Sequence, residues 1–291
     1  MMESRHKIRL GTLQKIYDIG KKISLIDENK RATTIRAAQA EKVVEKVLLH
    51  CGSIVKLLSI DKEDYAELDI ALVASAARNI IDSANIYFYV SERGISEEEV
   101  NLRYNMQILN YYKNIKNIFG KLDFSLTSSR MRLIDAENIR NEIKNSKIYL
   151  QADSNERSLM LSGKQFINKP DMKILDYNIE SGIYNLLSNS THSFYIGLSN
   201  NSLSKSGIFA SYIDFIMLAI IAVETAIIYT ANIINDYMIL RKKLGKKLSE
   251  HERVIVKSLM EPDYIYEYLE HQKDFFDGDI INISPSATHD Q

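Results

Sequence analysis

The chain has 291 residues, and its 37 Lys and Arg against 38 Asp and Glu leave a formal net charge of −1. This balance excludes a global electrostatic attraction to nucleic acid, so only a local basic face can provide one. Apolar residues make up 45% of the chain, whereas it has only 3 Pro and 11 Gly. That composition favours long helices over short strands and turns, and we therefore predict an all-α fold.

Two amphipathic helices are predicted first. Apolar residues recur at three- and four-residue steps in Lys7–Ile26, and in Ala32–Leu58 an apolar stripe alternates with charged positions. The next helix, Ala66–Arg93, differs because its long apolar middle carries only Arg78 and Asp82 as charges. These two residues share one helical face. We expect Ala66–Arg93 to be a buried helix.

The end of this helix and the start of the next have clear local signals. Gly94 is suited to end the buried helix, and Ser96 with Glu99 forms a capping box that opens a helix over Glu97–Phe119. Gly120 is expected to close that helix. The short connection predicts that the two helices pack antiparallel as neighbours.

The middle of the chain is less regular. A helix with a solvated outer face is predicted over Met131–Ile148, and short helices and loops over Gln151–Met172. Asp171–Tyr195 returns to a helical pattern with an interruption around Ser188–Ser193. A polar loop, Ser199–Ser206, follows.

The most apolar stretch, Ile208–Leu240, is predicted to be the central helix, because apolar residues occupy every side of its helical wheel. Such a helix is covered either by other helices or by lipid. Its uncharged runs are shorter than the roughly 18 residues that a bilayer span needs, and Glu224 interrupts them. We therefore expect a core helix. A membrane-associated effector stays an alternative because a basic cluster follows: Arg241, Lys242, Lys243, Lys246 and Lys247.

The C-terminal part is predicted to add a capping box at Ser249 and Glu252, a last amphipathic helix from Pro262, and a flexible tail over 277–291. No linker-like stretch divides the chain, so residues 1–276 are expected to form a single elongated helical domain built around the helices at about 66–93 and 208–240.

Cys51 is the only cysteine, which excludes an intrachain disulfide and a thiolate zinc cluster. Its apolar neighbours predict a core position. The N-terminal residues lack the apolar segment of a signal peptide. We expect a cytoplasmic protein with no metal and no cofactor.

The sequence contains no glycine-rich phosphate loop and no HExxH, CxxC or GxSxG motif. Of the histidines, His192 stands out because it lies where a helix gives way to polar residues before the central helix. An imidazole there is suited to act as an acid, a base or a donor to phosphate. The alternative is structural, with His192 and Ser188 bonding each other at a helix end.

One pairing of motifs resembles a known family. Arg78-Asn-Ile-Ile-Asp82 on an apolar helix is followed by Tyr184-Asn-Leu-Leu-Ser188-Asn-Ser-Thr-His192. This combination is similar to a bacterial domain family of the HEPN type (higher eukaryotes and prokaryotes nucleotide-binding). The likeness covers about residues 66–240.

The resemblance implies an all-α bundle, frequently dimeric, of the kind found in toxin–antitoxin and phage-defence proteins, whose active members are metal-independent ribonucleases that use an Arg and a His. For this chain it implies His192 and Arg78 as catalytic residues. It also implies RNA contacts from Arg103, Ser188 and Asn189. The expected partners are RNA and a second copy of the chain or another protein.

The chain departs from this family at one point. Ribonuclease members carry an Arg shortly before the His, where this chain has Asn185, Leu186 and Leu187. None of these offers the fixed positive fork that stabilises a phosphorane-like transition state. The alternative function is therefore a catalytically silent helical module that acts through protein–protein contacts.

Glu224 needs a cation, because an unpaired buried carboxylate costs several kcal/mol. Arg78, on the other buried helix, is the expected partner, and Asp82 is expected to share the same structural ion pair.

Overall fold

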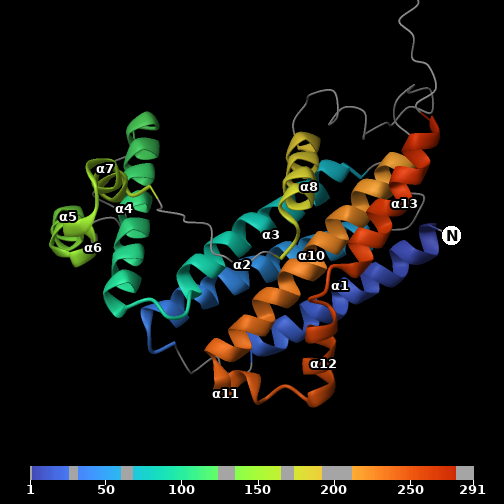
Figure 1. Cartoon of the computed structure of the whole chain (residues 1–291), viewed down its shortest axis with the longest axis horizontal. Helices are drawn as coiled ribbons and strands as arrows, with labels where there is room; N and C mark the ends of the chain where they lie inside the picture. The colour runs from blue at the N-terminus through green and yellow to red at the C-terminus, as the bar shows by residue number, and fades with distance from the viewer. Residues whose placement is uncertain are drawn as a thin grey trace, which may run out of the picture.

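The computed structural model describes residues 2–25, 32–59, 68–123, 135–164, 174–191 and 212–279. All regular secondary structure in these ranges is helical, which confirms the predicted all-α class. Figure 1 shows a large bundle of long helices and, beside it, a smaller group of helices that projects from one end.

Four long helices make up the centre of the bundle: α1 (Met2–Leu25), α2 (Ile35–Leu58), α3 (Ile70–Ser91) and α10 (Tyr212–Leu240). The two helices predicted to be central, α3 and α10, do pack against each other, and α1 and α2 pack on them. The segment Phe215–Leu240 is long and apolar enough to cross a membrane, but 94% of its most apolar window is buried inside the protein. Other helices therefore cover α10 on all sides, as expected of a core helix.

Shorter helices complete the bundle. These are α8 (Tyr177–Ser190), α11 (Lys242–Gly245), α12 (Glu250–Ser258) and α13 (Asp263–Asp279). Helix α8 packs on α3, whereas α11, α12 and α13 pack on α10. Cys51 lies fully buried in this core beside Thr230, and burial raises the pKa of its thiol to about 12. Its predicted core position is confirmed.

The smaller group, which we call the α4–α7 lobe, consists of α4 (Glu97–Lys121), α5 (Ala136–Asn145), α6 (Lys147–Gln151) and α7 (Ser154–Ser162). It has a hydrophobic cluster separate from that of the bundle: Leu102, Met106, Leu109, Ala136, Ile143 and Met160. Within residues 1–276, the described helices therefore bury their apolar side chains in two separate clusters, one in the bundle and one in the lobe.

The prediction that α3 and α4 pack antiparallel as neighbours is wrong. The apolar face of α4 contacts α5 and α7 instead, so α4 turns away from α3 after the short connection (Figure 1). Gly120 does not end α4 either, because the helix runs through it to Lys121.

Some local signals are confirmed and others only in part. Gly94 has a φ of +86°, a conformation that suits glycine, but α3 already ends at Ser91 with Glu92 as its C-cap. Ser96 Oγ accepts the Glu99 N–H at the start of α4, whereas the Glu99 carboxylate accepts from Arg103. The capping box of Ser249 and Glu252 is reciprocal. The helix predicted over Met131–Ile148 is broken at Ser146, which caps α6.

The predicted polar loop Ser199–Ser206 lies outside the described residues, and so do residues 280–291 of the predicted tail. The first residues of that tail, 277–279, belong to α13.

Candidate functional site

The two halves of the sequence motif meet where α8 packs on α3. Arg78 on α3 donates from Nε and Nη2 to the Tyr184 hydroxyl on α8, at 3.1 and 2.9 Å. Its guanidinium carbon lies 5.1 Å from the centre of the Tyr184 ring. These residues are 106 positions apart in sequence. The fold therefore brings together the Arg and the Tyr that the resemblance relates.

Arg78 is a cation that stays accessible. The hydrogen bond to Tyr184 raises the pKa of Arg78 above its ordinary value, and burial opposes this only in part. The expected pair with Asp82 is present at 3.7 Å between Nη2 and Oδ2, while 33% of the Arg78 side chain remains exposed. Arg78 is held in place by two neighbours and still presents a charged edge to solvent.

The C-terminal turn of α8 carries polar side chains. Ser188 is half-buried one turn after Tyr184, on the same side of the helix, and Asn189 is exposed. The hydroxyl of Ser190 donates to the Leu186 carbonyl at 2.8 Å, and that of Thr191 donates to the Ser188 carbonyl at 2.7 Å. The described part of α8 therefore ends with hydroxyls bonded to its own backbone.

His192 lies outside the described residues, one position after Thr191. Its catalytic role and its alternative bond to Ser188 both remain predictions. On the face shared by α3 and α8, the structure describes the Arg78–Tyr184 contact, Ser188 and Asn189.

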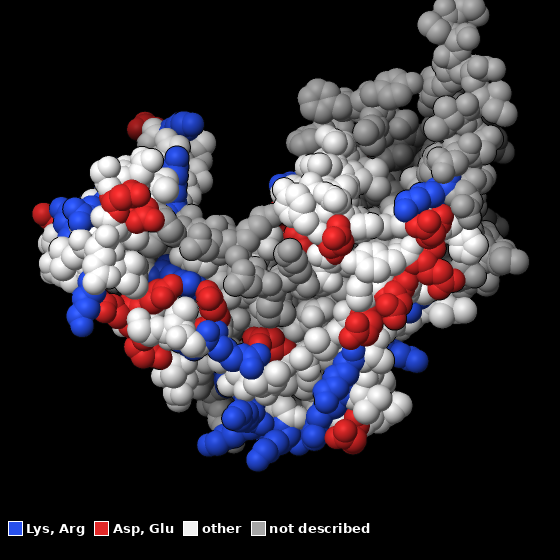
Figure 2. All heavy atoms as spheres, viewed as in Figure 1, with Lys and Arg blue, Asp and Glu red and all other residues white. Residues whose placement is uncertain are grey.

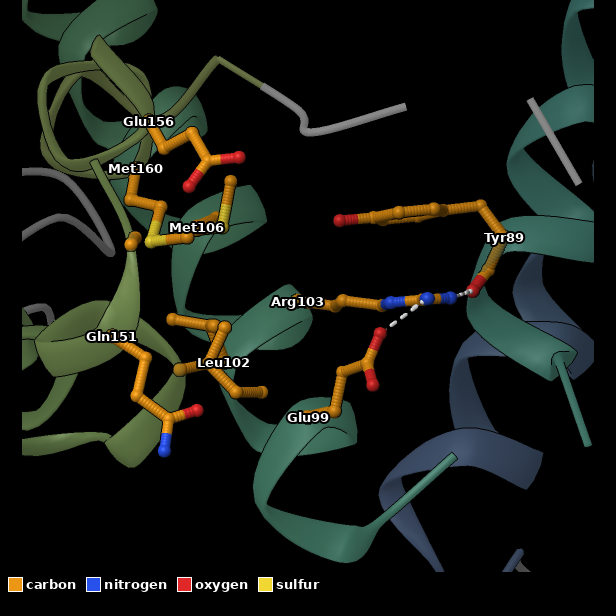
Figure 3. Close-up of a pocket in the computed structure, with 10 residues that line it drawn as sticks. Tyr89, Glu99, Leu102, Arg103, Met106, Gln151, Glu156 and Met160 are labelled. Atoms are coloured by element: carbon orange, nitrogen blue, oxygen red, sulfur yellow. Dashed lines mark hydrogen bonds and ion pairs between the residues drawn. The ribbon is translucent and has the colours of Figure 1, made fainter. Parts of the chain in front are cut away.

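Arg103 is placed elsewhere, in the wall of a cavity of about 330 Å³ between α3 and the α4–α7 lobe (Figure 3). Its guanidinium stacks on the Tyr89 ring, 4.3 Å from the ring centre. It donates to the Tyr89 carbonyl at 2.5 Å, to Glu92 at 2.7 Å and to Glu99 at 2.5 Å. Two carboxylates thus neutralise this arginine, and only 12% of its side chain is exposed.

Glu224 is paired with Arg9 rather than with Arg78, so the expected ion pair between α3 and α10 is wrong. Arg9 donates from Nε and Nη2 to the two Glu224 carboxylate oxygens at 2.5 and 2.6 Å. The Arg9 guanidinium also lies over the Tyr264 ring, 4.2 Å from its centre. The physical reason is that α1 lies along α10, whereas Arg78 faces α8.

A signal for Arg9 is present in the sequence. Its position continues the stripe of α1 that the structure buries at Leu13, Ile16, Gly20 and Ile23, which steps by three and four residues. A charge on the buried face of one amphipathic helix and a charge inside the central helix are natural partners. Periodicity alone does not reveal which helices are neighbours.

Comparisons with known proteins add no relative: no family model, no curated protein and no solved structure matches the chain.

Proposed function

We propose that this chain is a HEPN-like bacterial defence or toxin-type protein that binds RNA without a metal ion, on the face shared by α3 and α8. The observation that carries the proposal is the contact of Arg78 with Tyr184, which joins the two halves of the motif. The phosphate contact in this proposal is Arg78.

The chemistry of this face suits an RNA strand. An arginine remains charged at every relevant pH, and its planar fork matches phosphate oxygens. Tyr184 fixes the guanidinium through its hydroxyl and offers a ring on which an unpaired base can stack. Ser188 and Asn189 lie in the next turn and add hydroxyl and amide donors.

Binding is tested by fluorescence anisotropy with a labelled single-stranded RNA in EDTA. The variant Arg78→Met removes the cation, and Arg253→Met on α12 is the matched control, because these arginines are 33% and 38% exposed and each has an ion pair on its own helix. We expect Arg78→Met to weaken binding about tenfold, the loss of one charged hydrogen bond, and the control to leave it unchanged. Equal affinities of the two variants would contradict this site.

Cleavage is tested separately with His192. In this step the RNA 2′-oxygen attacks the adjacent phosphorus and the bond to the 5′-oxygen breaks, with His192 moving a proton from the first oxygen or to the second. His192→Ala is expected to abolish cutting in EDTA while the helical circular dichroism stays unchanged. If the wild-type protein binds RNA and cuts none, the function is binding alone.

A second candidate is a catalytically silent module that acts through protein contacts. It is favoured by the ion pairs of Arg103 with Glu92 and Glu99. Because these carboxylates neutralise Arg103, this arginine does not offer its charge to a phosphate. Absence of RNA binding by the wild-type protein, with a stable complex with a second protein, supports this candidate over the first.

A further inference from the structure

A second basic site lies on the α4–α7 lobe, away from α3 and α8. A groove of about 470 Å³ runs between the C-terminal half of α4 and α5. Four cations line it, with one aromatic ring and one amide: Lys113, Lys116, Lys121, Arg140, Tyr112 and Asn117. No carboxylate belongs to this described lining.

Two of the lysines, Lys113 and Lys116, occupy the face of α4 that is otherwise its core face. One row steps by three and four residues along the helix: Leu102, Met106, Leu109, Lys113, Lys116 and Gly120. The opposite face of the same half-helix carries the exposed side chains of Tyr111, Ile118 and Leu122. In an ordinary amphipathic helix the apolar side chains lie on the core face and the charged side chains on the solvent face, so this arrangement is the reverse. The basic groove is therefore a continuation of the lobe's core face in which lysines replace apolar residues.

The described lining of the groove brings these cations together without a carboxylate between them. Burial lowers the pKa of Lys113, and the nearby charge of Arg140 on α5 lowers it further, so like charges face each other across the groove. Of the carboxylates on α5, Glu142 accepts from Asn105 and Asn138, and Glu137 is not part of the lining. The negative end of α4 accounts for a lysine in its last turn, such as Lys121, and Lys113 donates to the Leu161 carbonyl of α7 at 2.9 Å. Neither contact accounts for Lys116 or for Arg140 on α5.

We infer that this groove binds the phosphate backbone of single-stranded RNA, with Lys116, Lys121 and Arg140 on phosphates and Tyr112 under a base. The identity of the ligand rests on the proposed function. The cations from Lys113 to Lys121 extend over about 12 Å of helix, which suits consecutive phosphates of a strand better than one small anion. Basic grooves with an aromatic platform are the usual means of holding single strands. Gly120 leaves open space where a side chain would stand.

The test reverses two groove charges and compares them with two reversed elsewhere. Lys116→Glu with Lys121→Glu is the groove pair, and Lys243→Glu with Lys246→Glu is the matched control in the basic cluster around α11, where Figure 2 shows Lys and Arg side chains gathered at one end of the bundle. All four lysines are exposed, and both pairs change the net charge equally. RNA affinity is measured against salt concentration with a strand of about 20 nucleotides.

We expect the groove pair to lower the affinity and to reduce the slope of log K against log salt by about 0.7 for each lost phosphate contact. The α11 pair is expected to preserve the slope. A milder pair, Lys116→Gln with Lys121→Gln, is expected to reduce the slope equally and guards against misfolding of the charge-reversed protein. Equal slopes for the groove pair and the wild type, or equal losses in both lysine pairs, would overturn the inference.

The outcome also separates this groove from the α3–α8 face. Loss with Arg78→Met and none with the groove pair removes the groove and keeps the proposed function. Loss with the groove pair and none with Arg78→Met keeps the groove and removes the α3–α8 face. A wild-type protein without RNA affinity overturns both.

Discussion

A carboxylate and a guanidinium meet in the middle of the bundle, where Glu224 has no exposed surface. Burial raises the pKa of Glu224 above its ordinary value, and the hydrogen bonds and charge of Arg9 oppose that rise. The ring of Tyr264 covers the guanidinium. One bidentate pair thus connects α1 to the most buried helix of the protein.

The first prediction concerns Arg9→Met. The variant leaves Glu224 buried without a cation, and we expect a loss of about 3–5 kcal/mol of unfolding free energy at neutral pH. A carboxyl group whose folded-state pKa is raised contributes stability below its unfolded pKa and loses it as the pH rises through the folded value. Because the variant lacks the opposing cation, its stability is expected to recover as the pH falls. Urea unfolding at several pH values measures both effects.

The control for that prediction is the double variant Arg9→Met with Glu224→Met. Two apolar side chains of similar volume leave no unpaired charge in the core. The double variant is therefore expected to lose much less unfolding free energy than Arg9→Met. A pH-independent loss in Arg9→Met, equal to that of the double variant, would show that the ion pair is not what the residue supplies.

The residue that completes the N-terminal cap of α12, Glu252, also connects this helix to α1. Glu252 completes the capping box of Ser249 and also accepts from Lys22 at 2.8 Å. The Lys22 hydrogen bond is the main reason that the pKa of Glu252 falls to about 2 from its ordinary 4.5. One carboxylate therefore supports both the start of a helix and its contact with another.

The second prediction follows from that lowered pKa. A carboxylate with a depressed folded-state pKa stabilises the protein above its unfolded pKa, and this contribution is lost as the pH falls from about 4.5 towards about 2. Glu252→Gln is expected to be less stable than the wild type at neutral pH and to show a shallower loss in this acidic window. Thermal unfolding across the window measures it, and parallel curves for the two proteins would exclude the assignment.

The elements themselves were largely predictable, whereas their neighbours were not. The presence of α2 and α3 and the central position of α10 follow from apolar periodicity, which is local. Both α2 and α3 begin later than predicted, after the N-cap residues Thr34 and Asp69. The direction of α4 and the partner of Glu224 depend on which faces meet in space. Lys113 is an example. It follows Leu102, Met106 and Leu109 on the core face of α4, but it lines the groove instead of the lobe's core.

The candidate site divides in the same way. The sequence placed Arg78 and Tyr184 in one motif, and the structure brings them into contact. Arg103 was grouped with them because of its type and position, but it is enclosed by acids within its own neighbourhood. A short sequence motif shows which residue types are present, but it does not show which carboxylates lie beside an arginine in the fold.

The bundle and the α4–α7 lobe have separate hydrophobic clusters. Helices α2 and α3 make the lobe's main described contacts with the bundle, and both contacts are small compared with the packing within the bundle. The two parts are therefore expected to differ in local stability.

The third prediction tests that difference with Leu109→Ala. Leu109 is fully buried in the lobe's cluster, and its truncation is expected to cost about 2–5 kcal/mol there. Hydrogen exchange measured by mass spectrometry is expected to accelerate in α4, α5 and α7 and to stay unchanged in α3 and α10. Equal acceleration in α10 would show that the lobe and the bundle unfold as one unit.

Cross-linking tests most directly whether RNA binds the α3–α8 face, as we propose. A photoreactive single-stranded RNA is bound in EDTA, irradiated and digested, and the attached peptides are identified by mass spectrometry. We predict cross-links to the α8 peptide that contains Tyr184, with a second group at Tyr112 where the groove holds the same strand. Cross-links confined to other surfaces, or none at an RNA concentration that saturates binding, would contradict the claim.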